Sequence, residues 1–253
     1  MAGYYSRPAQ LARQMRQLLF PRRCPCCRRV LGTLPFCEVC IPRLEELRRG
    51  PVMRLDVSRH YLGALDGAAA PYRYEGVVRS AILRAKYEGE SWTAVELGVE
   101  MTARLFAEVE MHFAEPVPGL VHGAAIGYDC IVPVPATSRR RGYNVPERMA
   151  QPLAHALGLP LLPKALCRVR AGRHQAGLSL DERLANAAGA FRAQEPELVE
   201  GKRVLLVDDV ITTGATAAAC AQALLDAGAH SVFAVAMAVT ENEMDAPSRA
   251  SGR

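Results

Sequence analysis

Two adjacent aspartates, Asp208 and Asp209, stand between a run of four apolar residues and a loop rich in threonine. The apolar run, 204–207, has the composition of a buried strand. It would deliver both carboxylates to the carboxyl edge of a sheet, where ligands bind in open α/β folds. The loop then opens a helix, whose backbone amides and dipole favour an anion. This order suits a sugar phosphate, because the acids can accept from sugar hydroxyls while the loop holds the phosphate.

The loop itself supplies the donors that a phosphate needs. Its glycine lets the backbone approach an anion closely, and its hydroxyls add donors. The predicted loop residues are Thr212, Thr213, Gly214, Ala215 and Thr216. Both carboxylates follow the strand over 204–207. Since side chains alternate along a strand, they reach one ligand only through a turn at the strand end, which the Thr-Thr-Gly loop would supply at a solvent-facing edge. The alternative is structural, because Asp and Thr are common N-caps and would then only cap the helix at 215.

Five of the eight cysteines lie within 17 residues near the start of the chain. Cys24 and Cys27, and again Cys37 and Cys40, are separated by two residues, a spacing at which paired thiolates bind one tetrahedral Zn²⁺. A closed set of four thiolates leaves no position for water, so the site would be structural, and metal binding would drive folding of this short segment. The fifth, Cys26, is either a free thiol or an alternative ligand. A cluster of reduced structural cysteines is the alternative to a metal site.

The spacing of apolar residues predicts the elements that position these groups. Helices are predicted over 8–20, 41–49, 76–86, from 91 onward, over 146–158 and over 215–227. Strands are predicted over 130–132, 164–169, 204–207 and 232–239, with a hairpin around Asp66-Gly67 inside 64–74 and a linker over 51–60. Short apolar runs that alternate with helices indicate an α/β fold with a mostly parallel sheet.

Composition limits the class of protein. The chain has 253 residues, of which 50% are hydrophobic and 23% charged, as in ordinary globular proteins. No apolar run approaches the ~20 residues of a membrane span, and the stretch 18–20 is too short for a secretory signal. We therefore expect a soluble cytoplasmic protein without membrane insertion. Residues 1–50 carry a net charge of +7 against −2 for the rest, so this segment either binds nucleic-acid phosphates or forms a solvated face.

The segment 204–216 resembles the signature that binds phosphoribosyl pyrophosphate (PRPP) in type I phosphoribosyltransferases. Several wider stretches are similar to the ComF (ComFC/GntX) family, whose zinc ribbon also resembles the cysteine-rich start. These stretches are Pro133-Val134-Pro135 followed by Arg140-Arg141-Gly142-Tyr143-Asn144, Tyr74-Glu75-Gly76 with Lys86-Tyr87, and the spaced Gln175, Arg183, Asn186 and Phe191. The resemblance runs from about residue 18 to 240. It departs from the family at Val145, where the family has Gln.

The resemblance implies a type I phosphoribosyltransferase-like domain over 60–240, with a sheet flanked by helices. An N-terminal helix and zinc ribbon over 1–50 would precede it, and a polar tail over 241–253 would follow. It also implies that Asp208 and Asp209 hold the ribose hydroxyls of PRPP, that the loop holds its 5′-phosphate, and that Mg²⁺ bridges the leaving pyrophosphate. The candidates for pyrophosphate binding and for a covering hood are Lys86, Arg139, Arg140, Arg141, Gln175 and Arg183. Otherwise the arginine run is a solvated turn and the hood an exposed hairpin.

Three functions are compatible with this resemblance. The first is a PRPP-binding accessory that handles single-stranded DNA during natural competence, with DNA on the basic N-terminal segment and competence proteins as partners. The second is an active phosphoribosyltransferase with an unknown acceptor. The third is a PRPP-sensing regulator that binds without turnover.

Overall fold

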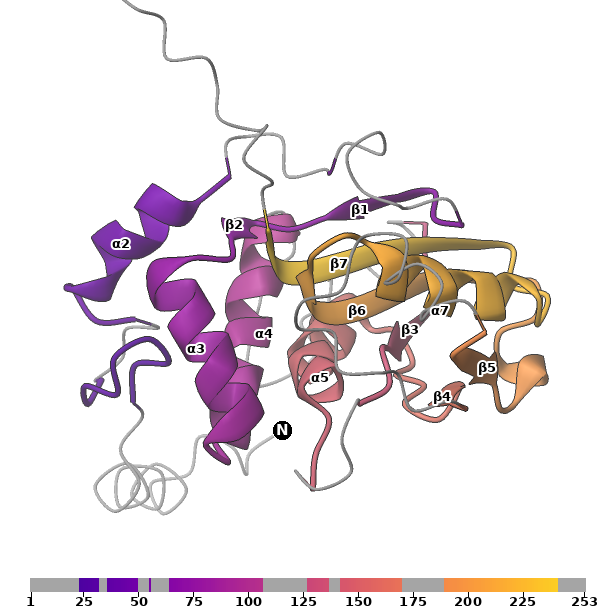
Figure 1. The fold of residues 1–253 in the computed structure, drawn as a ribbon, viewed down its shortest axis with the longest axis horizontal. Helices are drawn as coiled ribbons and strands as arrows, with labels where there is room; N and C mark the ends of the chain where they lie inside the picture. Colours follow the sequence, from indigo (N-terminus) through magenta and orange to yellow (C-terminus); the bar gives the residue numbers. More distant parts are fainter. Residues whose placement is uncertain are drawn as a thin grey trace, which may run out of the picture.

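A computed structural model of the chain describes residues 23–31, 36–49, 55, 64–106, 127–136, 142–169 and 189–240 (Figure 1). The predicted helix over 8–20, the tail over 241–253 and most of the predicted linker lie outside these residues. So do five predicted site residues: Arg139, Arg140, Arg141, Gln175 and Arg183. In the described part of the chain no helix has the length and apolar character needed to cross a membrane.

Five parallel strands form the main sheet, which confirms the predicted α/β architecture. Across the sheet the order is β1 (Gly67–Ala69), β7 (Ser231–Val239), β6 (Arg203–Ile211) and β3 (Cys130–Pro133), and β2 (Tyr72–Arg73) pairs with β7 beyond β1. The predicted hairpin around Asp66-Gly67 is wrong, because β1 and β2 both run parallel to β7 and form successive pieces of one edge. Pro71 lies between them, and a proline has no N–H to donate to a ladder.

Helices cover both faces of this sheet. On one face lie α3 (Gly76–Tyr87), α4 (Ser91–Leu105) and α5 (Val145–Leu157), and on the other lies α7 (Ala215–Leu225) (Figure 1). Side chains alternate along β6, so the strand contributes to the hydrophobic cores on both faces of the sheet. Leu205 and Val207 pack with α3, α4 and α5, whereas Val204 and Leu206 pack with α7. These helices match the predicted ones closely, and α5 ends at Gly158 in the left-handed conformation, as a C-terminal glycine predicts.

The predicted strand at 164–169 does not join the parallel sheet. The structure has a shorter strand there, β4 (Leu166–Arg168), which pairs antiparallel with β5 (Phe191–Ala193), and the 3₁₀ helix η3 (Pro196–Leu198) follows. Leu166 and Phe191 are buried in the same core cluster as α7, so this hairpin lies against the α7 side of the molecule. An apolar run of three residues fits either kind of pairing, so periodicity could not separate them.

The described cysteine-rich residues, 23–31 and 36–49, are called the cysteine module below. Its helix α2 (Cys40–Leu47) lies close to the predicted 41–49. The module shares one core cluster with α3, α4 and α5, to which it contributes Leu31, Phe36 and Leu44 as well as buried cysteines. Polar contacts add to this packing, since Arg104 of α4 reaches Glu45 at 2.6 Å. The module is therefore packed onto the α/β body.

Candidate functional site

Strand β6 extends further than the sequence predicted, and Asp208 and Asp209 lie inside it. Its pairing with β7 continues to Ile211, opposite Val239, whereas its pairing with β3 stops where Pro133 faces Val207. The end of β6 that carries both aspartates thus projects beyond β3. A turn before Asp208 is not needed, because side chains from both faces of the projecting strand can reach the space past the end of β3.

A cavity of about 210 Å³ lies beside this projecting end of β6. Residues 134–136, which directly follow β3, form part of its wall. The polar lining includes both aspartates together with Lys86, Asn144, Arg168, Thr212 and Thr216. The structure therefore brings Lys86 from α3 to the same cavity as the aspartates and two threonines of the predicted loop.

The two aspartates are buried, with 9% of Asp208 and 5% of Asp209 exposed, so the expected solvent-facing position is wrong. An oxygen of Asp209 lies 2.7 Å from Nζ of Lys86. One oxygen of Asp208 accepts from the backbone N–H of Asp209 at 2.8 Å. The carboxylates thus have different partners although they are adjacent in sequence.

Burial and neighbouring charges shift the pKa values of two groups in the cavity. Burial, and then the charge of Asp209, raise the pKa of Asp208 to about 7, although Lys86 and the backbone N–H of Asp209 act in the opposite direction. Burial also acts against the charged form of Lys86, but the carboxylate of Asp209 outweighs it and raises the pKa of that lysine. Lys86 is therefore charged at neutral pH, and a second positive charge in the cavity would stabilise ionised Asp208.

The threonine loop connects β6 to α7, and its hydroxyl groups make two kinds of contact. Thr212 and Thr216 line the cavity, whereas the hydroxyl oxygen of Thr213 accepts from the backbone N–H of Ala215 at 3.4 Å. Gly214 is the N-cap residue of α7 and has a φ of +82°, a conformation that glycine adopts without strain. Because the N-cap is Gly214 and both aspartates belong to β6, the alternative that the aspartates cap this helix is wrong.

Three residues that line the cavity were not among the predicted site residues. Asn144 donates to the carbonyl of Val134 at 2.8 Å and so ties the segment before α5 to the end of β3. The guanidinium of Arg168 lies 5.0 Å from the centre of the Phe191 ring, and Tyr74 lines the cavity opposite. The signal for Tyr74 and Asn144 was their position in the stretches that resemble the ComF family.

Val145 directly follows Asn144 and lies in the core. The side chain is fully buried in the cluster shared by α3, α4 and α5. At this position the protein thus uses an apolar side chain for packing of α5.

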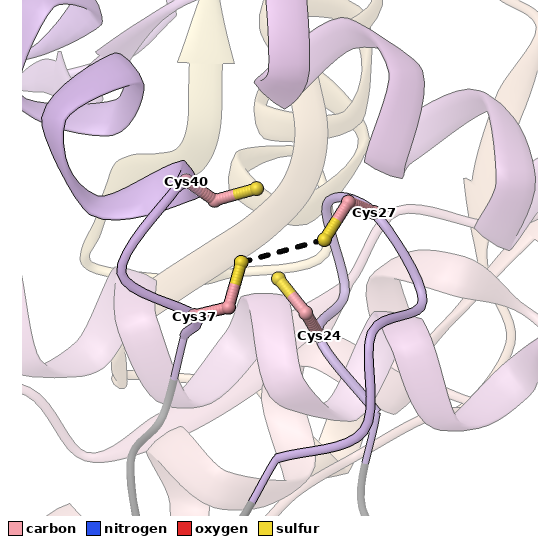
Figure 2. Close-up of side chains that lie close together, drawn as sticks. All are labelled: Cys24, Cys27, Cys37 and Cys40. Carbon is pink, nitrogen blue, oxygen red and sulfur yellow. Dashed lines mark hydrogen bonds between the residues drawn. The ribbon is translucent and has the colours of Figure 1, made fainter.

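The second candidate site is the cysteine module, where Cys24, Cys27, Cys37 and Cys40 converge (Figure 2). Their sulfur atoms all lie within 4.8 Å of one another, and those of Cys27 and Cys37 are 3.4 Å apart. Zn–S bonds of ~2.3 Å in a tetrahedron require sulfur separations of roughly 3.8 Å. The four thiols can therefore hold a zinc ion after small shifts, and the set does not include Cys26.

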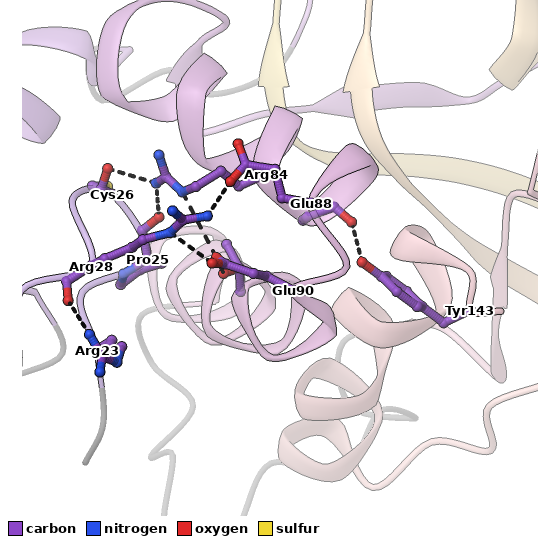
Figure 3. Close-up of polar contacts among 10 residues, drawn as sticks. Arg23, Pro25, Cys26, Arg28, Arg84, Glu88, Glu90 and Tyr143 are labelled. Atoms are coloured by element: carbon purple, nitrogen blue, oxygen red, sulfur yellow. Dashed lines mark hydrogen bonds and ion pairs between the residues drawn. The ribbon is translucent and has the colours of Figure 1, made fainter. Parts of the chain in front are cut away.

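The basic residues of the module are partly committed to contacts within the molecule. Arg28 forms ion pairs with Glu88 and with Glu90, the latter at 2.7 Å (Figure 3). Arg23 and Arg29 are exposed. Of these three arginines, Arg28 therefore already has its charge balanced.

Comparison with known proteins shows that part of the chain is similar to one family and to several curated proteins. Residues 131–251 match the family model described as a phosphoribosyl transferase domain. The chain is 46% identical over 107 residues to the DNA utilization protein YhgH of Salmonella typhi. The aligned segment covers 41% of this chain and 46% of that protein. It is 40% identical over 92 residues to competence protein F of Haemophilus influenzae, covering 35% and 40% of the two chains. The match thus spans slightly less than half the length of these curated relatives.

Among solved structures, one match is a glutamine PRPP amidotransferase from B. subtilis complexed with ADP and GMP. It covers 56% of this chain and 26% of that chain at 23% identity, with a TM-score of 0.34.

Proposed function

Because the phosphoribosyl transferase domain, the identity to YhgH and competence protein F and the four-cysteine cluster together fit a protein of the ComF family, we propose that this chain binds PRPP and acts in DNA uptake or utilisation. The observation that carries the proposal is the pair of buried carboxylates at the projecting end of β6, beside a helix N-terminus that begins at Gly214.

Each part of PRPP has matching groups in this arrangement. Asp208 and Asp209 would accept from the ribose hydroxyls, in charge-assisted bonds worth roughly 1.5–3 kcal/mol each. The 5′-phosphate would lie on the amides and hydroxyls that begin at Thr212, where the dipole of α7 favours an anion. Lys86 and Arg168 would then face the pyrophosphate from the other walls of the cavity.

The donor set also fits a magnesium ion that enters with PRPP. Both carboxylates are buried, Lys86 is paired with Asp209, and the raised pKa of Asp208 follows from burial and from the charge of Asp209. Mg²⁺ prefers oxygen ligands and is commonly held by phosphate oxygens, water and few carboxylates. When bound, it would stabilise the negative charge of the pyrophosphate.

The role in DNA uptake rests on the relatives and on charge. YhgH is a DNA utilization protein and competence protein F is a competence protein by name. The first 50 residues carry a net charge of +7, which favours binding to a nucleic-acid backbone. Because Arg28 is already paired with two glutamates, we propose that single-stranded DNA contacts Arg23, Arg29 and the preceding basic residues instead.

Calorimetry of PRPP binding to the full-length protein, with and without Mg²⁺, tests the first part. We expect saturable binding that requires Mg²⁺, and no comparable binding of ribose 5-phosphate. Absence of PRPP binding at millimolar concentration would contradict the proposal. For DNA, we expect an affinity for a single-stranded oligonucleotide that falls with salt, and an Arg29→Gln variant with a smaller salt slope.

A matched variant separates specific contacts with DNA from general loss of charge. Arg192 lies on β5, away from the module, and is exposed. Arg192→Gln removes the same charge and should leave the salt slope of DNA binding unchanged. Equal effects of the two substitutions would instead indicate that the basic module has no special role in DNA binding.

A further inference from the structure

The last turn of α3 touches the cysteine module on one side and the PRPP cavity on the other. Arg84 donates to the backbone carbonyls of Pro25 and Cys26, the latter at 2.6 Å (Figure 3). Two residues later, Lys86 lies 2.7 Å from Asp209. At 3.6 residues a turn, these two side chains leave the helix about 200° apart, so one turn presents a cation to each site.

The turn is held between these two contacts by its own backbone. The last four carbonyls of a helix have no partner within the helix, and that of Ala85 is one of them. It accepts from the hydroxyl of Tyr143 at 2.6 Å. Tyr143 directly precedes Asn144, which lines the cavity. Contacts at three consecutive residues, 84 to 86, thus connect the module, the segment before α5 and β6.

Charge reinforces the link on the module side. Arg84 is only 13% exposed, and its Nε lies 3.9 Å from a carboxylate oxygen of Glu90. Glu90 also pairs with Arg28 of the module at 2.7 Å. Arg28 reaches Glu88, the residue that follows α3, as well. The module therefore holds the junction between α3 and α4 through Arg28 and these two glutamates, in addition to the carbonyls that bind Arg84.

We propose that the cysteine module sets the affinity of the cavity for PRPP through Arg84, a positioning residue that holds the last turn of α3 and keeps Lys86 against Asp209. The inference rests on the proposed PRPP binding. Pro25 and Cys26 lie between the thiols of Cys24 and Cys27, so a metal ion held by those thiols fixes both carbonyls. When the metal is lost this short segment loses its fixed shape, and Arg84 loses two acceptors together.

Linkage makes the effect reciprocal. If the metal-loaded module raises the affinity for PRPP by some factor, then PRPP must raise the affinity of the module for metal by the same factor. The proposal therefore has a readout at the metal site that is independent of any turnover.

The experiment uses full-length, zinc-loaded protein and measures two quantities. Zinc affinity is determined by competition with a zinc-selective chelator, with and without saturating PRPP and Mg²⁺, and PRPP affinity is determined by calorimetry. In the wild-type protein we expect PRPP to raise the zinc affinity by about fivefold or more. In Arg84→Gln we expect PRPP affinity to fall by a similar factor while one zinc per chain remains bound. The effect of PRPP on zinc should then disappear.

A control variant breaks a different anchor of the same module. Glu45→Gln removes the ion pair between α2 and Arg104, and Arg104 keeps Glu100 as its partner. This anchor does not involve the last turn of α3, so PRPP affinity and the effect of PRPP on zinc should be unchanged. Arg84→Lys, which keeps the charge, should restore part of the PRPP affinity lost in Arg84→Gln.

The outcomes separate the coupling from the proposed function. If wild-type protein binds no PRPP, both are wrong. If it binds PRPP but zinc affinity does not respond, or if Arg84→Gln binds PRPP as tightly as wild type, only the coupling is wrong. Equal losses in Glu45→Gln and Arg84→Gln would assign the effect to general loosening of the module and would also overturn it. The zinc measurement on wild-type protein needs no variant and decides the matter even if Arg84→Gln does not fold.

Discussion

The cavity and the cysteine module are both built from short loops, but different forces hold those loops. The cavity lies at the end of β6, and β6 and β7 each have nine residues in a sheet covered by helices on both faces. Cys24 and Cys27 instead lie in a turn closed by the isolated bridge between Arg23 and Val30, Cys40 begins the short helix α2, and the module has little core of its own. Hydrophobic burial can therefore position the strand end that carries the two aspartates, whereas the module needs a metal ion and its arginine contacts.

Removal of one thiol should give the largest effect, and it acts first on the module. Cys37→Ser should abolish binding of zinc, expected at about one per chain, and should loosen residues 23–49, because structural zinc supplies most of the folding free energy of such a site. Metal analysis and protection of the module from proteolysis measure this. Cys167→Ser on β4 is the matched control and should keep its zinc. Full zinc content in Cys37→Ser would contradict the assignment of the four ligands.

The cavity can be disturbed alone through Asp209. Asp209→Asn keeps the shape of the side chain but removes its charge, so PRPP affinity should fall about tenfold or more, equivalent to ~1.4 kcal/mol. Calorimetry measures the affinity, and the zinc content should not change. Asp226→Asn, at the exposed end of α7, is the control and should bind PRPP normally. An unchanged affinity in Asp209→Asn would leave this carboxylate without a role in binding PRPP.

A third experiment tests whether ionisation of buried Asp208 lowers the free energy of unfolding. Because burial raises the pKa of Asp208 to about 7 in the native state, the native protein binds more protons than the unfolded chain between about pH 4 and 7. The free energy of unfolding of ligand-free protein should therefore fall as pH rises through this window. Denaturant midpoints measure the slope, and Asp208→Asn should remove much of it. A slope of the same size in that variant would point to other groups.

The smallest expected effect concerns the opposite end of the sheet. Hydrogen bonds from Arg203 at the start of β6 lower the pKa of Asp129, just before β3, to about 2. The pair thus stabilises the native state at neutral pH, and this contribution should be lost as pH falls from about 4 to 2. Both side chains are partly exposed to solvent, so Asp129→Asn should lower the thermal midpoint only slightly at pH 7 and leave it unchanged near pH 2. A large effect at pH 2 would have another cause.

Local patterns predicted the elements well, and long-range pairing explains what they missed. Apolar spacing is a local property, so the helices at 76–87, 145–157 and 215–225 and the strand at 231–239 followed from it. The true end of β6 depends on how far β7 pairs with it. The division of the sheet edge into β1 and β2 at Pro71 depends on pairing with β7 as well. The apolar pattern within one segment does not show how far a neighbouring strand extends. The predicted strand end at 207 and the predicted hairpin at 64–74 were therefore wrong.

The candidate sites show the same limit. Paired cysteines two residues apart predicted a set of four thiols that the structure brings together, because the spacing itself sets the geometry. The exclusion of Cys26 from that set, and the use of its carbonyl by Arg84, follow from contacts 58 residues apart along the chain. The burial of Asp208 and Asp209 likewise depends on where β3 stops. Residue types predicted which kinds of ligand the two sites could bind, and tertiary packing determined the burial and the contacts of the site residues.

The split edge strand has a consequence for solubility. An uncovered edge offers unpaired backbone groups on which other chains can aggregate. Here the chain that leaves the cysteine module covers this edge: the backbone N–H of Arg49 donates to the carbonyl of Pro71, and that of Leu55 to the carbonyl of Ala68, each at 2.8 Å. Arg48, Arg49 and Leu55 thus contact both halves of the edge. A truncated chain that begins near residue 60 would expose a ready template for edge-to-edge association, even though its hydrophobic core would be nearly complete.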